Sequence, residues 1–156
     1  MQEATICYPV DGDRVLLIHK KRGVGSGNYN GPGGKVEAGE TPRQAARREV
    51  REEVRLEVED LEKTGELEFV FGDEPFMHVH VFRTGSWEGT PRETAEADPE
   101  WFHRAAIPYD EMWEDDRLWL PLALDGESFV GYFRFDADGD EMSGAFVDRD
   151  VSFDSS

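Results

Sequence analysis

Short stretches in which apolar and polar residues alternate recur along the chain, and this pattern predicts a protein built mainly from β-strands. Residues 5–10 and 14–19 flank the turn sequence Asp11-Gly12-Asp13, so they predict a strand, a tight turn and a second strand. Later stretches predict further strands at residues 66–71, 76–83, 100–103, 129–135 and 144–148. A glycine-rich stretch at residues 23–34 precedes a predicted helix, a position that favours a functional loop over a flexible linker.

The helix is predicted from residue 42 onward, because start signals precede a helical spacing of apolar residues. Thr41 is a favourable N-cap, Pro42 suits the first helical position, and Gln44 can close a capping box. One apolar stripe follows at Ala46, Val50 and Val54. Arginines recur on a different face, which we expect to be solvated, at Arg43, Arg47, Arg51 and Arg55. A second helix is predicted at residues 118–124, although Pro121 lies within it. Together these elements predict an α/β fold in which helices sandwich a mixed sheet.

Length and composition limit the organisation of the chain. Its 156 residues suffice for one domain with a sizeable core, and we expect a single domain over residues 1–151 and a frayed end at residues 152–156. The N-terminus lacks the order of a signal peptide and no apolar run is long enough to span a bilayer, so we expect a soluble, cytoplasmic protein. We also expect a monomer. The single cysteine, Cys7, excludes a disulfide framework within the chain.

Acidic residues greatly outnumber basic ones. Asp and Glu total 35 against 17 Lys and Arg, so the formal net charge is −18. This charge argues against nucleic-acid polymers and anionic membranes as non-specific partners. The acidic residues are spread along the whole chain, a composition that resembles proteins of salt-accumulating organisms. At molar salt the Debye length shrinks to about 3 Å, and the self-repulsion of such a chain largely disappears.

Three carboxylates share one face of the first predicted helix. Glu49, Glu52 and Glu53 stand at positions i, i+3 and i+4, which lie on the same side of a helix. Their like charges repel one another, and a hard divalent cation with oxygen ligands would offset that cost. Taken alone, these three residues would more often form a solvated acidic face. The surrounding sequence therefore decides between the two explanations.

That surrounding sequence resembles the Nudix box. The segment reads Gly34-x5-Glu40-x7-Arg48-Glu49-Val50-x-Glu52-Glu53-x-Arg55-Leu56, and it departs from the family pattern only at Arg55, where the family has glycine. We expect this departure to affect the end of the helix, because a non-glycine residue in the left-handed conformation costs about 1–2 kcal/mol.

The resemblance implies a Nudix fold and a metal-dependent hydrolase that cleaves pyrophosphate linkages. It implies that Glu49, Glu52 and Glu53 bind magnesium, or manganese in its place, with the backbone carbonyl of Gly34 as a further ligand. It also implies that Arg48 orients a carboxylate of the helix, while Glu40 ties the preceding loop to the helix. The ions would bridge and screen the phosphate oxygens while water attacks phosphorus.

Further segments resemble the branch of the family that hydrolyses oxidised purine nucleoside triphosphates. They lie at residues 20–23, 29–36, 79–82, 112–116 and 131–135, so the similarity covers most of the chain. The resemblance implies that the purine is held by Asn30, Asp115, Asp116 and Trp113. An asparagine amide offers both a donor and an acceptor, an indole offers a stacking surface, and one of two neighbouring carboxyls can stay protonated.

The same branch implies roles for several other residues. Phe69, Thr5 and Lys20 match residues that line its base pocket, whereas Val24 stands where the branch has an aromatic residue near the pocket mouth. Glu96 matches an acidic residue near the metal ions, where it would be an extra ligand or a general base. The sequence leaves the general base open between Glu52, Glu53 and Glu96.

Three other features favour structural roles. His78 and His80 can share one face of a strand, but without a cysteine or an apparent third ligand a structural role is favoured over a zinc site. Residues 136–140 begin like a calcium loop, yet Val147 stands where such a loop needs glutamate, so a hairpin turn is favoured. Cys7 lies in a predicted core strand, and we expect it to be buried.

The sequence thus predicts a magnesium-dependent hydrolase of purine nucleoside triphosphates that releases a monophosphate and pyrophosphate. Oxidised purine nucleotides, 8-oxo-dGTP first among them, are the expected small-molecule substrates, and nucleotide-pool sanitation is the expected use. One alternative is the same chemistry on an unmodified nucleotide, a nucleotide sugar or a dinucleotide. Another is a catalytically silent nucleotide-binding module, which Arg55 favours and the intact Glu49, Glu52 and Glu53 argue against.

Overall fold

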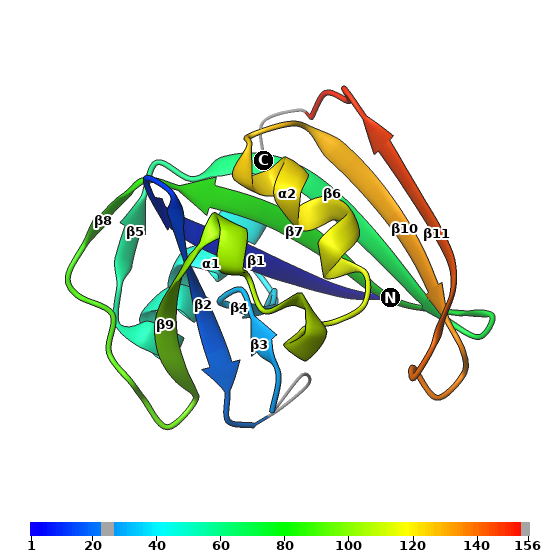
Figure 1. The fold of residues 1–156 in the computed structure, drawn as a ribbon, viewed down its shortest axis with the longest axis horizontal. Helices are drawn as coiled ribbons and strands as arrows, with labels where there is room; N and C mark the ends of the chain where they lie inside the picture. The colour runs from blue at the N-terminus through cyan, green and yellow to red at the C-terminus, as the bar shows by residue number, and fades with distance from the viewer. Residues whose placement is uncertain (23–26, 154–156) are drawn as a thin grey trace.

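A computed structural model describes residues 1–22 and 27–153 of the chain. Its main feature is a nine-stranded mixed sheet in which the order β11-β10-β6-β7-β1-β2-β3 forms the main path (Figure 1). Two further strands branch off this path, because β4 pairs with β1 and β9 pairs with β2. A separate two-stranded sheet is formed by β5 and β8.

The strands of the large sheet are β1 (Gln2–Asp11), β2 (Arg14–Lys20), β3 (Tyr29–Asn30), β4 (Gly33–Lys35), β6 (Glu62–Phe71), β7 (Glu74–Thr84), β9 (Ala97–His103), β10 (Phe129–Phe135) and β11 (Met142–Arg149). The small sheet pairs β5 (Glu57–Glu59) with β8 (Ser86–Glu88). Two short 3-10 helices, at Arg104–Ala106 and Tyr109–Glu111, lead from β9 toward the second α-helix. β1 runs parallel to β7 and β10 runs parallel to β6, whereas the other pairs are antiparallel, so the sheet is mixed as predicted.

The two α-helices, α1 (Pro42–Val54) and α2 (Asp116–Leu124), cover opposite faces of this sheet (Figure 1). Alternate residues of β1 show this, because side chains alternate between the two faces of a strand. Ala4 and Tyr8 pack in the cluster that contains Trp119 and Leu120 of α2. Cys7, between them, packs in the cluster that contains Ala46, Val50 and Val54 of α1. The predicted arrangement of helices around a mixed sheet is therefore confirmed.

The strand predictions were right in position; residues 129–135 match β10 at both ends, and the other predicted strands were short at one or both ends. β6 begins four residues before the predicted start at residue 66, and β9 begins three residues before residue 100. The strands β3, β4, β5 and β8 were missed, because runs of two or three residues are too short to show alternation. Helix α2 begins two residues before the predicted start and includes Pro121.

Some smaller predictions can also be compared with the structure. Residues 136–140 connect the antiparallel strands β10 and β11, which confirms the hairpin turn. Cys7 is fully buried, and its burial raises the pKa of the thiol to about 12. The frayed end at residues 152–156 stays a prediction, and within it the ring of Phe153 lies 5.1 Å from Nζ of Lys63. Residues 154–156 and Val24 lie outside the described residues.

One face of α1 differs from the prediction. Arg47, Arg51 and Arg55 are exposed as expected. Arg43 is half-buried instead, because its guanidinium lies 5.2 Å above the ring of Phe82 and donates to the carbonyl oxygen of Leu61. The aliphatic stem of an arginine can cover apolar surface while its charged end keeps polar partners, which explains the exception.

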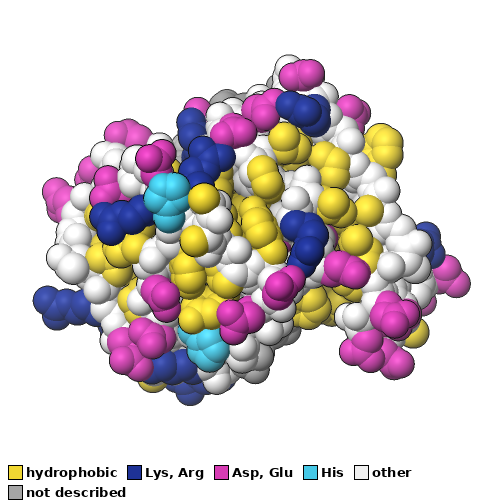
Figure 2. All heavy atoms as spheres, viewed as in Figure 1, with side chains coloured by type: hydrophobic (Ala, Val, Ile, Leu, Met, Phe, Trp, Pro, Cys, Tyr) yellow, Lys and Arg dark blue, Asp and Glu magenta, His cyan; other side chains and the backbone are white. Residues whose placement is uncertain are grey.

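Acidic side chains are distributed over the surface rather than gathered in one patch, as Figure 2 shows for the face that carries α2. Neither helix among the described residues is long and apolar enough to cross a membrane.

Candidate functional site

Helix α1 is held at both ends by local interactions that the sequence encodes. At its start, Thr41 Oγ1 accepts from the backbone N–H of Gln44, and the side chain of Gln44 accepts from the backbone N–H of Thr41, which completes the capping box. At its end, Arg55 adopts the left-handed conformation with a φ of 65°, and its N–H donates to the carbonyl oxygen of Arg51. The helix therefore ends where the Nudix box places glycine, even though arginine stands there.

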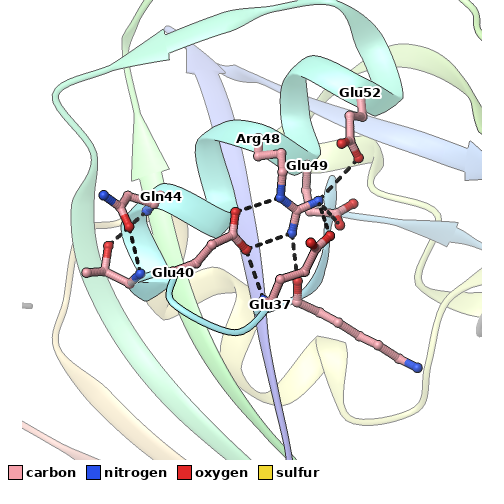
Figure 3. Close-up of polar contacts among 8 residues, drawn as sticks. Glu37, Glu40, Gln44, Arg48, Glu49 and Glu52 are labelled. Atoms are coloured by element: carbon pink, nitrogen blue, oxygen red, sulfur yellow. Dashed lines mark hydrogen bonds and ion pairs between the residues drawn. The ribbon is translucent and has the colours of Figure 1, made fainter.

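Arg48 links the carboxylates of α1 to the loop that precedes the helix (Figure 3). Its Nε and Nη2 donate to the two carboxylate oxygens of Glu40 at 2.7 and 3.0 Å, a two-point geometry that fixes the guanidinium plane. Its Nη1 donates to Glu49 at 2.8 Å and to Glu52 at 3.2 Å. Its Nη2 also donates to the carbonyl oxygen of Lys35 at 2.9 Å. Hydrogen bonds from Arg48 lower the pKa of Glu40 to about 2, so this carboxylate stays charged at neutral pH.

Glu53 is the most buried carboxylate of the group. Its side chain reaches the start of β4, where Oε1 accepts from the backbone N–H of Gly33 at 2.7 Å. Burial raises the pKa of Glu53 to about 8 and also raises the pKa of Glu49, because both carboxylates lose contact with water. A divalent cation beside these groups would favour their ionised forms and remove this cost.

The backbone at Gly34 fits the approach of a cation as well. A Cβ atom at this position would stand 2.5 Å from the carboxyl carbon of Glu49, so only glycine lets this carboxylate lie against β4. Carboxylate and carbonyl oxygens are the ligands that magnesium and manganese prefer. The residues that would hold such an ion are thus Glu49, Glu52, Glu53 and the carbonyl of Gly34.

Glu96 reaches this group from the loop before β9. Thr94 Oγ1 donates to the carbonyl oxygen of Glu53 at 2.7 Å, which fastens the loop to the end of α1. The charge of Glu96 lies close enough to Glu53 to contribute to its raised pKa. The carboxylate of Glu96 also accepts from Arg22 at 2.8 Å, a pairing that the sequence did not indicate because the two residues are 74 positions apart.

A cavity of about 1010 Å³ extends from these carboxylates to the apolar face of α2. Every sequence-predicted site residue except Arg48 lines it, namely Thr5, Lys20, Asn30, Gly34, Glu49, Glu52, Glu53, Phe69, Glu96, Trp113, Asp115 and Asp116. Arg48 stands behind the carboxylates and acts on them rather than on the contents of the cavity. The structure thus brings together residues that lie as far apart in the sequence as Thr5 and Asp116.

The end of the cavity near α2 carries two buried acids. Asp115 is 2% exposed and Asp116 is 6% exposed. Burial raises the pKa of Asp115 to about 6 and the pKa of Asp116 well above its ordinary value, so this pair holds a proton near neutral pH. Trp119 Nε1 donates to Asp115 Oδ2 at 2.8 Å, and since an indole N–H is only a donor, that oxygen carries no proton. Trp119 was missed as a site residue because its spacing on α2 reads as a core position.

Aromatic side chains form one wall of this end. Trp113 meets the edge of Phe135 with the ring centroids 6.3 Å apart, and Phe69 packs beside Phe133 at 5.8 Å. Phe71 and Phe76 stack almost in parallel at 4.3 Å and also line the cavity. These last two residues were predicted only as parts of strands, and no local sequence signal distinguishes them from other strand aromatics.

Polar groups from β1 and β3 border the same space. Asn30 lies on the cavity wall, where its Nδ2 donates to the carbonyl oxygen of Asn28 at 3.2 Å. Thr5 Oγ1 is buried and has no hydrogen-bond partner among the described residues. Together with the acids of α2, these groups offer donors and acceptors beside flat apolar surfaces, which suits a planar heterocycle.

Comparison with known proteins identifies relatives of this architecture. A model of the NUDIX domain matches residues 1–123. The chain is 50% identical over 132 residues to an oxidized purine nucleoside triphosphate hydrolase of Danio rerio, covering 84% of this chain and 85% of the relative. It is 44% identical to the oxidized purine nucleoside triphosphate hydrolase of Mus musculus, again covering 84% of this chain and 85% of the relative. The crystal structure of a MutT protein from Bacillus halodurans superposes with a TM-score of 0.82 at 28% identity, covering 95% of this chain and 98% of the other. These matches confirm the resemblance found in the sequence, and the chain belongs to the Nudix domain family.

Proposed function

We propose that this Nudix hydrolase cleaves purine nucleoside triphosphates, with oxidised purines preferred, and releases a nucleoside monophosphate and pyrophosphate. The observation that carries the proposal is one continuous cavity with an acidic, cation-binding end at α1 and a polar, aromatic end at α2. A nucleotide needs both, because its phosphates require cations and its base requires hydrogen bonds beside a stacking surface. The names of the zebrafish and mouse relatives support the same substrate class.

The residues of the chain divide the work along the cavity. Glu49, Glu52, Glu53 and the Gly34 carbonyl would hold magnesium, which supplies positive charge to the phosphate oxygens and lowers the pKa of the attacking water. Arg48 keeps Glu49 and Glu52 in place through its hydrogen bonds. Glu52, Glu53 and Glu96 are the carboxylates available to accept the proton of the water.

The other end of the cavity selects the base. The amide of Asn30 can donate and accept at the purine edge, and the unprotonated oxygens of Asp115 and Asp116 can accept there. Trp113 offers a stacking surface. A buried acid that keeps its proton acts as a donor, which lets the pair recognise a base edge that presents an acceptor. The triphosphate would then extend past Lys20 toward α1.

The test of the reaction is a hydrolysis screen. Purified protein is incubated with magnesium and molar potassium chloride, and products are separated for 8-oxo-dGTP, unmodified nucleotides, a nucleotide sugar and a dinucleotide. We expect the largest kcat/KM for the oxidised purine triphosphate, with monophosphate and pyrophosphate in equal amounts. A preference for a nucleotide sugar or dinucleotide, or release of single phosphate, would contradict the proposal.

The role of the carboxylates is tested by Glu52→Gln and Glu53→Gln. Each change keeps the shape of the side chain and removes charge at the cation-binding end, so we expect a loss of most turnover with an unchanged fold. Glu59→Gln is the matched control, because Glu59 is an exposed glutamate of β5 outside the cavity. Near-normal turnover in both Glu52→Gln and Glu53→Gln would overturn the assignment of the cation site.

The role of the base pocket is tested by Asn30→Ala and Asp115→Ala. Each change leaves a polar group of the bound base unpaired, which costs about 1–3 kcal/mol, so we expect a roughly 5- to 150-fold loss of preference for 8-oxo-dGTP over dGTP. The measurement is the ratio of kcat/KM for the two substrates. An equal loss of activity on both, with their ratio unchanged, would show that the base binds elsewhere.

A further inference from the structure

A second group of metal-binding side chains lies outside the cavity, on the face of the sheet that packs against α1. Glu3 of β1 stands beside His78 of the parallel strand β7, and His80 follows two residues later on the same face. One ligand atom from each of these three side chains lies within 4.8 Å of the other two. Glu3 is the third ligand that the sequence pattern of His78 and His80 lacked.

Neighbouring carboxylates orient both imidazoles. His78 Nε2 lies 2.7 Å from Glu66 Oε1, and His80 Nε2 lies 2.8 Å from Glu3 Oε1. When Nε2 of His78 donates to Glu66, its Nδ1 keeps the lone pair that a metal ion binds. A carboxylate that accepts from the second nitrogen of a ligating histidine is a frequent feature of metal sites.

Lys63 carries a positive charge beside this cluster and opposes a cation there. Its Nζ lies 2.8 Å from Glu66 Oε2 and 3.2 Å from His80 Nδ1. While Lys63 donates to Nδ1, His80 carries its proton on Nε2 and donates to Glu3. A metal ion at Nε2 therefore requires that proton to move to Nδ1, which can then no longer accept from Lys63, so Lys63 lowers the affinity of the site without blocking its ligands.

We propose that Glu3, His78 and His80 bind a borderline divalent ion such as zinc, at a site separate from the carboxylates of α1. Two imidazoles and one carboxylate suit zinc, copper or nickel, whereas magnesium prefers oxygen ligands alone. Three protein ligands leave a fourth position for water. Because Glu3 lies near the start of β1, the bound ion cross-links the N-terminal strand to β7 and stabilises the folded chain.

The experiment is a zinc titration of the full chain in excess magnesium. Calorimetry measures the binding of zinc, and thermal melts measure its effect on stability. Magnesium occupies the oxygen ligands of α1, and repeating the titration on Glu52→Gln separates the two sites further. We expect one equivalent of zinc to bind and to raise the melting temperature in both proteins. Cobalt in place of zinc gives visible absorption bands that report the coordination geometry of the bound ion.

Variants of the cluster assign the ligands. We expect His78→Gln and His80→Gln each to weaken zinc binding by more than about tenfold, and Glu66→Gln to weaken it by roughly tenfold. His19→Gln is the matched control, because His19 is an exposed histidine of β2 that is not in the cluster. Lys63→Met removes the competing donor and should tighten binding.

Each result decides the proposal. Equal zinc affinity in the wild type, His78→Gln and His80→Gln would overturn it, as would the absence of a zinc-dependent rise in melting temperature in excess magnesium. Weaker zinc binding by Lys63→Met than by the wild type would contradict the claim that Lys63 lowers the affinity of the site. Melts without metal establish that each variant is folded before its affinity is compared.

Discussion

Asp115 and Asp116 show how the environment of a side chain sets its chemistry. Both acids are buried at the start of α2, and burial raises the pKa of each. The sequence predicted a shared proton from the adjacency of two acids beside an aromatic residue. It did not indicate the hydrogen bond from Trp119, which keeps one oxygen of Asp115 unprotonated, because that bond depends on how α2 is seated on the sheet.

These raised pKa values predict a pH-dependent stability. Below about pH 4 the two acids are protonated in both the folded and the unfolded chain, so their raised pKa values do not change the free energy of unfolding there. As the pH rises, the unfolded chain releases protons that the folded chain retains. The free energy of unfolding therefore falls until the pH has passed the pKa values that the two acids have in the folded chain. Asp116→Asn removes this loss, and we expect it to raise the melting temperature at pH 8 by several degrees, at about 2–4 °C per kcal/mol.

The measurement is a series of thermal melts between pH 4 and pH 8 in constant molar potassium chloride. The difference between Asp116→Asn and the wild type should shrink toward zero as the pH falls. Asp98→Asn is the matched control, because Asp98 is an exposed aspartate of β9. A difference that does not change with pH would show that the buried acid is not the cause.

Among single residues, the carboxylates of α1 were the most predictable and their partners the least. The spacing of Glu49, Glu52 and Glu53 determines which helix face they share, since helix geometry is local. The ion pair of Glu96 with Arg22, and the approach of Glu3 to His78, join distant parts of the chain. Periodicity carries no information about such contacts, so only the folded structure shows them.

At the scale of elements, the two ends of α1 differ in how well the sequence suits them. The capping box at Thr41 and Gln44 matches its prediction, because both partners lie within one helical turn. Arg55 at the other end adopts a left-handed conformation that favours glycine. The left-handed conformation of Arg55 costs free energy but ends the helix where the family has glycine. The substitution of arginine for glycine therefore leaves the carboxylates of α1 in place.

That cost predicts that Arg55→Gly stabilises the protein. The side chain of Arg55 is exposed, and relief of the left-handed strain should outweigh the greater freedom of glycine in the unfolded chain, for a net gain of about 1 kcal/mol. Denaturant titrations measure the free energy of unfolding. Arg47→Gly is a control of opposite sign, because glycine in the exposed middle of α1 should cost about 1 kcal/mol. A loss of stability in Arg55→Gly would contradict the account of the helix end.

Elements with strong local patterns were found from the sequence, and elements made by pairing alone were not. The strand β10 shows clear alternation, because its buried residues lie on one face and its exposed residues on the other. The strand β4, of three residues, exists because its backbone pairs with β1, and β5 exists because it pairs with β8. The parallel pairing of β1 with β7 likewise follows from packing between distant segments.

At the scale of the whole molecule, charge is the dominant feature. The net charge of −18 is spread over a surface on which many ion pairs are exposed, and exposed pairs contribute little to stability. A nucleoside triphosphate is itself a polyanion, so the field of the protein opposes its approach in dilute buffer.

We therefore predict that the melting temperature and the hydrolysis rate both rise between low and molar potassium chloride. Screening relieves repulsion within the folded protein and between the protein and its substrate. Magnesium should flatten the dependence, because it neutralises the carboxylates of α1 as well as the phosphates. Melts and initial rates over a salt series, with and without magnesium, provide the measurement. A melting temperature that is flat or falls with salt would show that the acidic composition is not a salt adaptation.

The position of β1 has a consequence for synthesis on the ribosome. This strand is made before its neighbours in the sheet and lies inside that sheet, where Thr5 pairs with His80 of β7. About 75 residues must follow before that neighbour exists, which takes about 4–15 s at a rate of 5–20 residues per second. During this interval the antiparallel partners β2 and β4 are the neighbours of β1 that have already been made. Translation thus separates the assembly of this sheet into an early half around β1 and β2 and a late half that begins with β6 and β7.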